Sequence, residues 1–155
     1  MASPNQILVA GPLLVGVVTT FFTIIVHAFV LDTIIEAVRR YVLRGRAGML
    51  LRDVRLIMNA TLLALAGHFV EIALWALSFV LCGEFSNFAA ALYYSAATYT
   101  TLGDGTIVIS ARWRLLGPLE AADGVLMFGV TTAMIFAVIQ RLVQARLGAQ
   151  HAPPI

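Results

Sequence analysis

Three long stretches of mostly apolar residues run through the chain, separated by short polar segments. Residues 7–31 carry no formal charge, residues 56–82 are interrupted by Asn59, His68 and Glu71, and a third stretch covers residues 115–140. About 20 predominantly apolar residues span the hydrocarbon core of a bilayer as a helix. The pattern therefore predicts an all-α membrane protein with three transmembrane helices.

A fourth apolar segment, residues 88–97, is too short to cross a membrane. Ser86 or Asn87 is suited to cap the start of a helix there. We therefore predict a re-entrant pore helix over residues 86–100, between an outer helix (54–82) and an inner helix (115–146). The C-terminal end of such a helix carries a partial negative charge, which favours a cation beside it.

The string Thr101-Leu-Gly-Asp-Gly105 follows this short helix directly. Non-helical backbone at membrane depth occurs only where it is buried in protein or lines a water-filled path. Two glycines two residues apart permit backbone angles that let successive carbonyls point the same way. A ring of such carbonyls can replace the hydration shell of an ion. One chain supplies one such segment, so the string predicts an ion filter in a symmetric homo-oligomer.

Composition agrees with a membrane protein, because 61% of the residues are hydrophobic and 12% are charged. Arginines crowd residues 39–55 and follow the third span, whereas only Arg112 and Arg114 lie on the other side. The positive-inside rule then places the first loop and the C-terminus in the cytoplasm, and the N-terminus and filter outside. We expect a multi-pass protein of the cell inner (plasma) membrane with no nucleic-acid partner. The N-terminus lacks the basic region of a signal peptide, so we expect the first span to be retained.

Residues 88–141 resemble the pore domain of tetrameric potassium-channel-like proteins. The segment Ala91-Leu-Tyr-Tyr-Ser95 is similar to their pore-helix aromatic pair followed by serine, and residues 100–105 are similar to their Thr-Thr-Val-Gly-Tyr-Gly filter. Asp104 stands where potassium-selective members have an aromatic residue, which is the pattern of the bacterial NaK-type non-selective cation channels. The resemblance implies a homotetramer whose pore domain is residues 46–155, preceded by an extra transmembrane helix and its cytoplasmic end in residues 1–45.

The sequence departs from the family pattern at three positions. Leu102 replaces the usual valine or isoleucine, Thr106 replaces an aspartate common in potassium-selective members, and Ala97 replaces a residue that is acidic in some members. The resemblance also implies roles for individual residues. The filter would be residues 101–105, ending at Gly105, with Na⁺ and K⁺ ligands at Thr101, Leu102, Gly103 and Asp104. Phe128 and Thr132 would line a water-filled cavity, and Phe136 or Gln140 would form the cytoplasmic constriction. Gly124 and Gly129 would be hinge or packing glycines.

The substitution at Asp104 changes the expected selectivity. An aspartate cannot supply the apolar packing of an aromatic side chain and prefers a hydrated environment. Discrimination between K⁺ and Na⁺ depends on the size of the ion-binding cavity or on the number of its ligands, and loss of the aromatic packing would disturb both. We therefore predict weak selectivity between Na⁺ and K⁺, with a K⁺-selective channel as the alternative. Carboxylate oxygens suit calcium, so we also expect external Ca²⁺ at the outer mouth to attenuate current. No cofactor other than permeant ions is expected.

Three acidic residues, Glu71, Glu120 and Asp123, fall inside the predicted spans. Ionisable residues inside a membrane are functional hypotheses by default. Because Ala97 leaves the pore helix without a carboxylate, one of the three is expected behind the filter, where it would couple pH to filter shape. The alternative for Glu120 and Asp123 is pairing with the arginines at 112 and 114.

Two further sets of polar residues lie in the first two spans. His68 and Glu71 are three residues apart on one helix face, which makes either half of a metal site or a structural pair. Asp32 and Glu36 are expected to pair with arginines of the first loop. The sequence holds no nucleophile constellation or complete metal-ligand set, so an enzyme is not expected.

Overall fold

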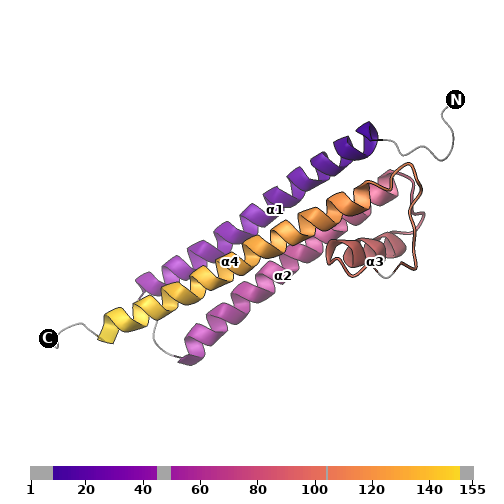
Figure 1. Cartoon of the computed structure of the whole chain (residues 1–155). Coiled ribbons are helices and arrows are strands. Elements are labelled where there is room, and N and C mark those ends of the chain that lie inside the picture. The colour runs from indigo at the N-terminus through magenta and orange to yellow at the C-terminus, as the bar shows by residue number, and fades with distance from the viewer. Residues whose placement is uncertain (1–8, 45–49, 104, 151–155) are drawn as a thin grey trace.

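The computed structural model describes residues 9–44, 50–103 and 105–150, and its regular secondary structure is helical (Figure 1). No described residue forms a strand. The helices are α1 (Ala10–Leu43), α2 (Leu50–Leu81), α3 (Phe88–Tyr99) and α4 (Leu116–Gln150). α1, α2 and α4 are long and apolar enough to cross a membrane. The prediction of an all-α protein with three membrane-length helices is thus confirmed.

The three long helices run side by side as a bundle (Figure 1). α1 and α4 begin at the same end, and α2 runs in the opposite direction between them in the chain. The short helix α3 has only 12 residues and packs against α2 and α4 at the end where α4 begins. The segment that follows α3 therefore lies at the side of the bundle.

The long helices extend beyond the apolar stretches that predict them. α1 continues to Leu43, and on its surface Glu36 accepts hydrogen bonds from Arg39 Nε at 2.8 Å and Arg40 Nε at 2.7 Å. Pairs three and four residues apart support a helix in water, so charged residues need not end it. Glu36 does pair with arginines, but these belong to α1 rather than to a loop.

One stripe of α1 is buried against α2 and α4, at positions spaced three or four residues apart. Small residues allow the close approach. A Cβ built at Gly16 would lie 2.6 Å from Leu119 Cδ1 of α4, and one at Gly67 of α2 would lie 3.0 Å from Val30 Cγ2 of α1. The opposite face of α1 is exposed and apolar, as expected of a surface that meets lipid.

Two apolar clusters form the core. One, toward the end of α4, includes Val30, Ile34, Ala64 and Val138. The other surrounds α3 and contains Trp75, Phe79, Tyr99, Ile72, Ile109, Leu116 and Met127. Each long helix also carries buried polar side chains: Thr23 and His27 on α1, His68 and Glu71 on α2, and Glu120 and Asp123 on α4. Buried polar groups must find hydrogen-bond partners, and these positions hold the candidate site.

Candidate functional site

The short helix α3 has defined ends. The Asn87 side chain accepts a hydrogen bond from the Ala89 amide at 2.9 Å, so Asn87 is the N-cap, one of the two residues expected there. At the other end the Thr100 amide still donates to the Ala96 carbonyl at 3.2 Å. The backbone then leaves the helix, and the predicted filter begins.

In the predicted filter, three described residues have a positive φ angle. Thr101 has φ 61°, Gly103 has φ 53° and Gly105 has φ 71°, so every second residue lies in the left-handed region. For a β-branched residue such as Thr101 this conformation is strained, at a cost of about 1–3 kcal/mol, and such strain gathers at functional sites. The Gly103 amide donates to the Ala97 carbonyl at 3.1 Å, which ties the segment back to α3. Asp104 lies outside the described residues.

The filter segment is open on one side of the single chain. Leu102 is 71% exposed, and Thr101, Gly103 and Gly105 are exposed as well. Nothing tests the predicted ion ligands at these residues, so their roles stay predictions. What the structure provides is a strained, exposed backbone segment at the C-terminal end of a short helix.

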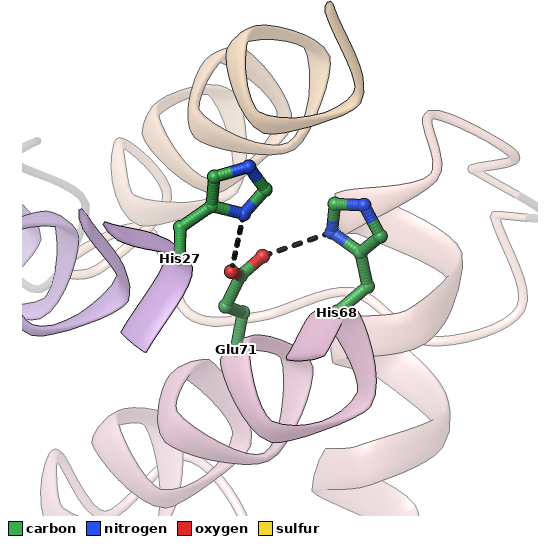
Figure 2. A group of neighbouring side chains, drawn as sticks. All are labelled: His27, His68 and Glu71. Carbon is green, nitrogen blue, oxygen red and sulfur yellow. Dashed lines mark hydrogen bonds and ion pairs between the residues drawn. The ribbon is translucent and has the colours of Figure 1, made fainter. Parts of the chain in front are cut away.

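A buried carboxylate lies directly behind the end of α3. The Tyr99 hydroxyl donates to Glu71 Oε2, and Glu71 is fully buried. His27 Nδ1 of α1 lies 2.8 Å from Glu71 Oε1, and His68 Nδ1 lies 2.9 Å from Glu71 Oε2 (Figure 2). One of three acidic residues was expected behind the predicted filter, and Glu71 is the one whose carboxylate contacts Tyr99, the last residue of α3.

Glu120 makes a separate buried contact with α3. Its Oε1 atom is bonded to the Ser95 hydroxyl, and the same Ser95 oxygen lies 2.8 Å from the Ile72 carbonyl of α2. The Ser95 hydroxyl donates, and its single proton is shared between the Glu120 carboxyl oxygen and the Ile72 carbonyl. Ser95 thus joins α3 to both α2 and α4.

Asp123 has the same kind of surroundings. Its Oδ2 atom lies 2.8 Å from the Thr23 hydroxyl and 2.8 Å from Trp75 Nε1, while the Thr23 hydroxyl also lies 2.7 Å from the Thr20 carbonyl. The Thr23 hydroxyl therefore lies between two acceptors, Asp123 and the Thr20 carbonyl. Among the described residues, Glu120 Oε2 and Asp123 Oδ1 have no hydrogen-bond partner. In the same part of the chain, neither acid forms an ion pair with an arginine.

The predicted cavity and constriction residues lie along α4. Phe128 is half-buried and packs on the His68 ring, with centroids 4.5 Å apart, and on the Tyr99 ring at 5.5 Å. Thr132 and Gln140 are exposed on the single chain, and Phe136 is 60% exposed. Their predicted places in a cavity or gate remain predictions.

The two α4 glycines differ in their surroundings. A Cβ at Gly124 would lie 2.1 Å from the Tyr99 carbonyl oxygen, so α4 crosses the end of α3 at backbone contact. At Gly129 nothing in the described part of the chain lies within 4 Å of such a Cβ. The Gly124 contact is a packing contact, and a hinge at either residue stays a prediction.

A second polar contact, absent from the sequence predictions, joins the three long helices at the far end of the bundle. Asp53 is buried, accepts a hydrogen bond from the Tyr41 hydroxyl at 2.8 Å, and accepts one from Arg146 Nε at 2.7 Å. Sequence reasoning placed residue 53 before the outer helix, but α2 already begins at Leu50. The contact thus links α1, α2 and α4.

Sequence reasoning also missed the part that α1 plays. Thr23 and His27 reach Asp123 and Glu71, and His68 Nε2 lies 3.0 Å from the Thr131 hydroxyl of α4. Polar residues four positions apart in the charge-free span 7–31 were the available signal. They share one helix face, which is the face that packs inward.

Comparison with known proteins gives one match. No curated protein and no solved structure matches the chain. Residues 67–141 match the family model described as "Ion channel". The matched stretch runs from the middle of α2 through α3 and the filter segment to Arg141 of α4. The part of the chain that holds α3 and the strained segment is therefore similar to the ion-channel family, and the match supports a potassium-channel-like pore domain there.

Proposed function

We propose that the chain is the pore-forming subunit of a homotetrameric cation channel and not an enzyme. The single observation that carries the proposal is the left-handed backbone at Thr101, Gly103 and Gly105, directly after α3. Positive φ angles at these residues allow successive carbonyls to face one side, where they can replace an ion's hydration shell. The C-terminal end of α3 adds a partial negative charge that favours a cation.

Assembly from copies of the chain follows from the same segment. One chain supplies one row of carbonyls, and Leu102 is 71% exposed beside it. A closed ring around an ion would bury this face against other subunits and complete the ligand set. Four subunits are proposed by analogy with potassium-channel-like pores, which the match over residues 67–141 supports.

We propose that the channel passes both Na⁺ and K⁺ with weak selectivity. The argument is chemical: an aspartate at position 104 cannot pack behind the filter as an aromatic residue does, and it attracts water. A ring of such carboxylates at the mouth suits Ca²⁺, so external Ca²⁺ should attenuate the current. The alternative is a K⁺-selective channel, in which Asp104 does not loosen the filter.

The proposed setting is the inner (plasma) membrane, with the filter facing outward. Arginines gather at the end of the bundle away from α3, including Arg39 and Arg40 of α1 and Arg146 of α4. The positive-inside rule assigns that end to the cytoplasm. Phe128 and Thr132 would then lie nearer the filter, and Phe136 and Gln140 nearer the cytoplasmic constriction.

Ion flux through purified protein in liposomes tests the proposal. We expect Na⁺ and K⁺ fluxes of similar size and a reversal potential that shifts little when one ion replaces the other. A reversal potential near the potassium equilibrium value would support the K⁺-selective alternative, and absence of any flux from folded protein would refute the channel.

A matched pair of variants tests the outer mouth. Asp104→Asn should relieve attenuation by external Ca²⁺, because it removes the carboxylates that bind the ion. Asp32→Asn makes the same change on the exposed surface of α1 and should leave the attenuation unaltered. Equal attenuation in Asp104→Asn and the unmodified protein would refute the Ca²⁺ site without bearing on conduction.

A further inference from the structure

His27, His68 and Glu71 bring three metal-ligating groups together inside the bundle. His27 comes from α1, and His68 and Glu71 lie one turn apart on α2 (Figure 2). One ligand atom from each lies within 4.8 Å of the others. The two histidines are 4% exposed and Glu71 is 0% exposed, so the ligand atoms are shielded from solvent. Both imidazole rings turn their Nδ1 atoms toward the carboxylate.

The remote nitrogens of both rings converge on one hydroxyl. His68 Nε2 lies 3.0 Å from Thr131 Oγ1, and His27 Nε2 lies 3.4 Å from the same atom. The two histidines, Glu71 and Thr131 thus form a closed ring of four contacts. Two imidazoles with one proton each and one hydroxyl carry three protons, so the four contacts call for one more positive charge within the ring, which either a proton or a metal cation can supply.

A metal cation bound by the two Nδ1 atoms would take the place of that additional proton. Each histidine would then carry its proton on Nε2 and donate it to Thr131, whose oxygen has two lone pairs. A metal-bound histidine usually donates its other ring N–H to an oxygen in this way, which fixes the ring's orientation. The Tyr99 hydroxyl, which donates to Glu71 Oε2, orients the carboxylate in the same manner.

We propose that His27 Nδ1, His68 Nδ1 and a carboxylate oxygen of Glu71 bind a divalent transition-metal ion of the zinc class. Two imidazole nitrogens and one carboxylate oxygen are a ligand set suited to Zn²⁺. The nitrogen–oxygen separations of 2.8 Å and 2.9 Å are hydrogen-bond distances. Ligands around a tetrahedral Zn²⁺ at about 2.1 Å lie roughly 3.4 Å apart, so the side chains open slightly around the ion.

The surroundings favour a cation. With Glu71 ionised, the ion and its ligands carry one net positive charge. Tyr99 is the last residue of α3, so the partially negative end of that helix lies beside the cluster.

Such an ion would fix α1 to the pore domain. His27 belongs to α1, which precedes the stretch that matches the ion-channel family, whereas His68 and Glu71 lie within it. Through the Glu71–Tyr99 contact the ion would also steady the end of α3, immediately before the filter. Metal binding itself does not depend on the proposed conduction.

Metal analysis of the purified full chain in detergent tests the proposal. We expect about one Zn²⁺ per chain after equilibration and removal of loosely bound metal, and a visible absorption band when Co²⁺ replaces Zn²⁺. Zn²⁺ should raise the unfolding temperature, and a chelator should lower it. The site would be refuted if the chain bound no Zn²⁺ or Co²⁺ at micromolar concentration. It would also be refuted if neither the metal nor the chelator changed the unfolding temperature.

Glu71→Gln is the decisive variant, because it keeps the fold's hydrogen bonds. The amide can donate to His27 Nδ1 and accept from His68, which fills all four contacts of the ring without a metal. This variant should remain folded and lose at least about 100-fold in Zn²⁺ affinity, and Thr131→Val should lose about 10–100-fold. His151→Gln, at a position outside the described residues, makes a comparable change and should bind normally. Equal Zn²⁺ binding by Glu71→Gln and the unmodified chain would show that the metal binds elsewhere and would overturn the assignment.

Discussion

The contact between Gly124 and the Tyr99 carbonyl makes a sharp prediction. A Cβ at position 124 would lie 2.1 Å from that oxygen and 3.0 Å from the carbonyl carbon. A carbon–oxygen contact is ordinarily no closer than about 3.3 Å, so Gly124→Ala must separate α4 from the end of α3 by about 1 Å. The position of a Cβ is set by the backbone and the Tyr99 carbonyl is itself backbone, so no side-chain rotation relieves the clash.

The expected cost follows from two opposing terms. Overpacking of this kind costs about 1–3 kcal/mol, while alanine gains up to about 1 kcal/mol over glycine in a helix. We expect a net loss of about 1–2 kcal/mol, measured as a lower thermal unfolding temperature of the purified protein. Because Tyr99 is two residues before Thr101, the displacement should also reduce ion flux in liposomes.

Gly129→Ala is the matched control on the same helix. Nothing in the described part of the chain lies within 4 Å of a Cβ there, so the change should leave stability equal or slightly higher. If Gly124→Ala unfolds at the same temperature as the unmodified protein, the close contact is not as described. If Gly129→Ala is equally harmful, the loss reflects glycine flexibility in α4 rather than the Tyr99 contact.

Two further predictions concern buried acids. Ser95→Ala removes the hydroxyl that contacts both Glu120 and the Ile72 carbonyl and should cost about 1–3 kcal/mol, whereas Glu120→Gln keeps an acceptor oxygen for Ser95 and should change stability by less than about 1 kcal/mol; thermal unfolding that ranks the two variants in the opposite order would contradict this role of Ser95. Asp53 is buried and bonded to Arg146, whose side chain is 37% exposed, so Asp53→Asn should cost about 1–2 kcal/mol by the same assay. Glu36→Gln breaks pairs whose arginine sides are mostly exposed and should cost less than about 0.5 kcal/mol; equal losses at the two sites would contradict the role of burial.

The helices could be predicted from the sequence because they depend on the length of the apolar stretches and on local chemistry. A span of about 20 apolar residues predicts a membrane helix wherever it occurs, and a ten-residue one excludes crossing. Asn87 was readable as a cap for the same reason, since a cap acts on the amides next to it. The helix ends were less accurate, because pairs such as Glu36 with Arg39 extend α1 beyond the apolar stretch.

The partners of the polar side chains were not readable, because they depend on how helices rotate against one another. From the sequence, Glu120 could either lie behind the predicted filter or pair with the arginines at 112 and 114. In the structure Arg112 lies over the Trp113 ring at 5.3 Å, and Glu120 faces Ser95 inside the bundle. The metal hypothesis for His68 and Glu71 lacked its third ligand for the same reason, because His27 lies 41 positions before His68 in the chain and on another helix.

The polar contacts of α1 determine how that helix sits in the bundle. In a membrane, lipid tails are as apolar as leucine, so apolar packing alone sets helix rotation and register only weakly. α1 bears three polar residues one turn apart on its buried face, and each is bonded to another helix: Thr19 to Ser78, Thr23 to Asp123 and His27 to Glu71. A shift of α1 by one residue would turn this face by about 100° and break all three contacts, leaving polar groups unpaired in an apolar interior. We therefore infer that these contacts fix the rotation and register of α1, and that its contact with Glu71, which is bonded to Tyr99, supports the end of α3.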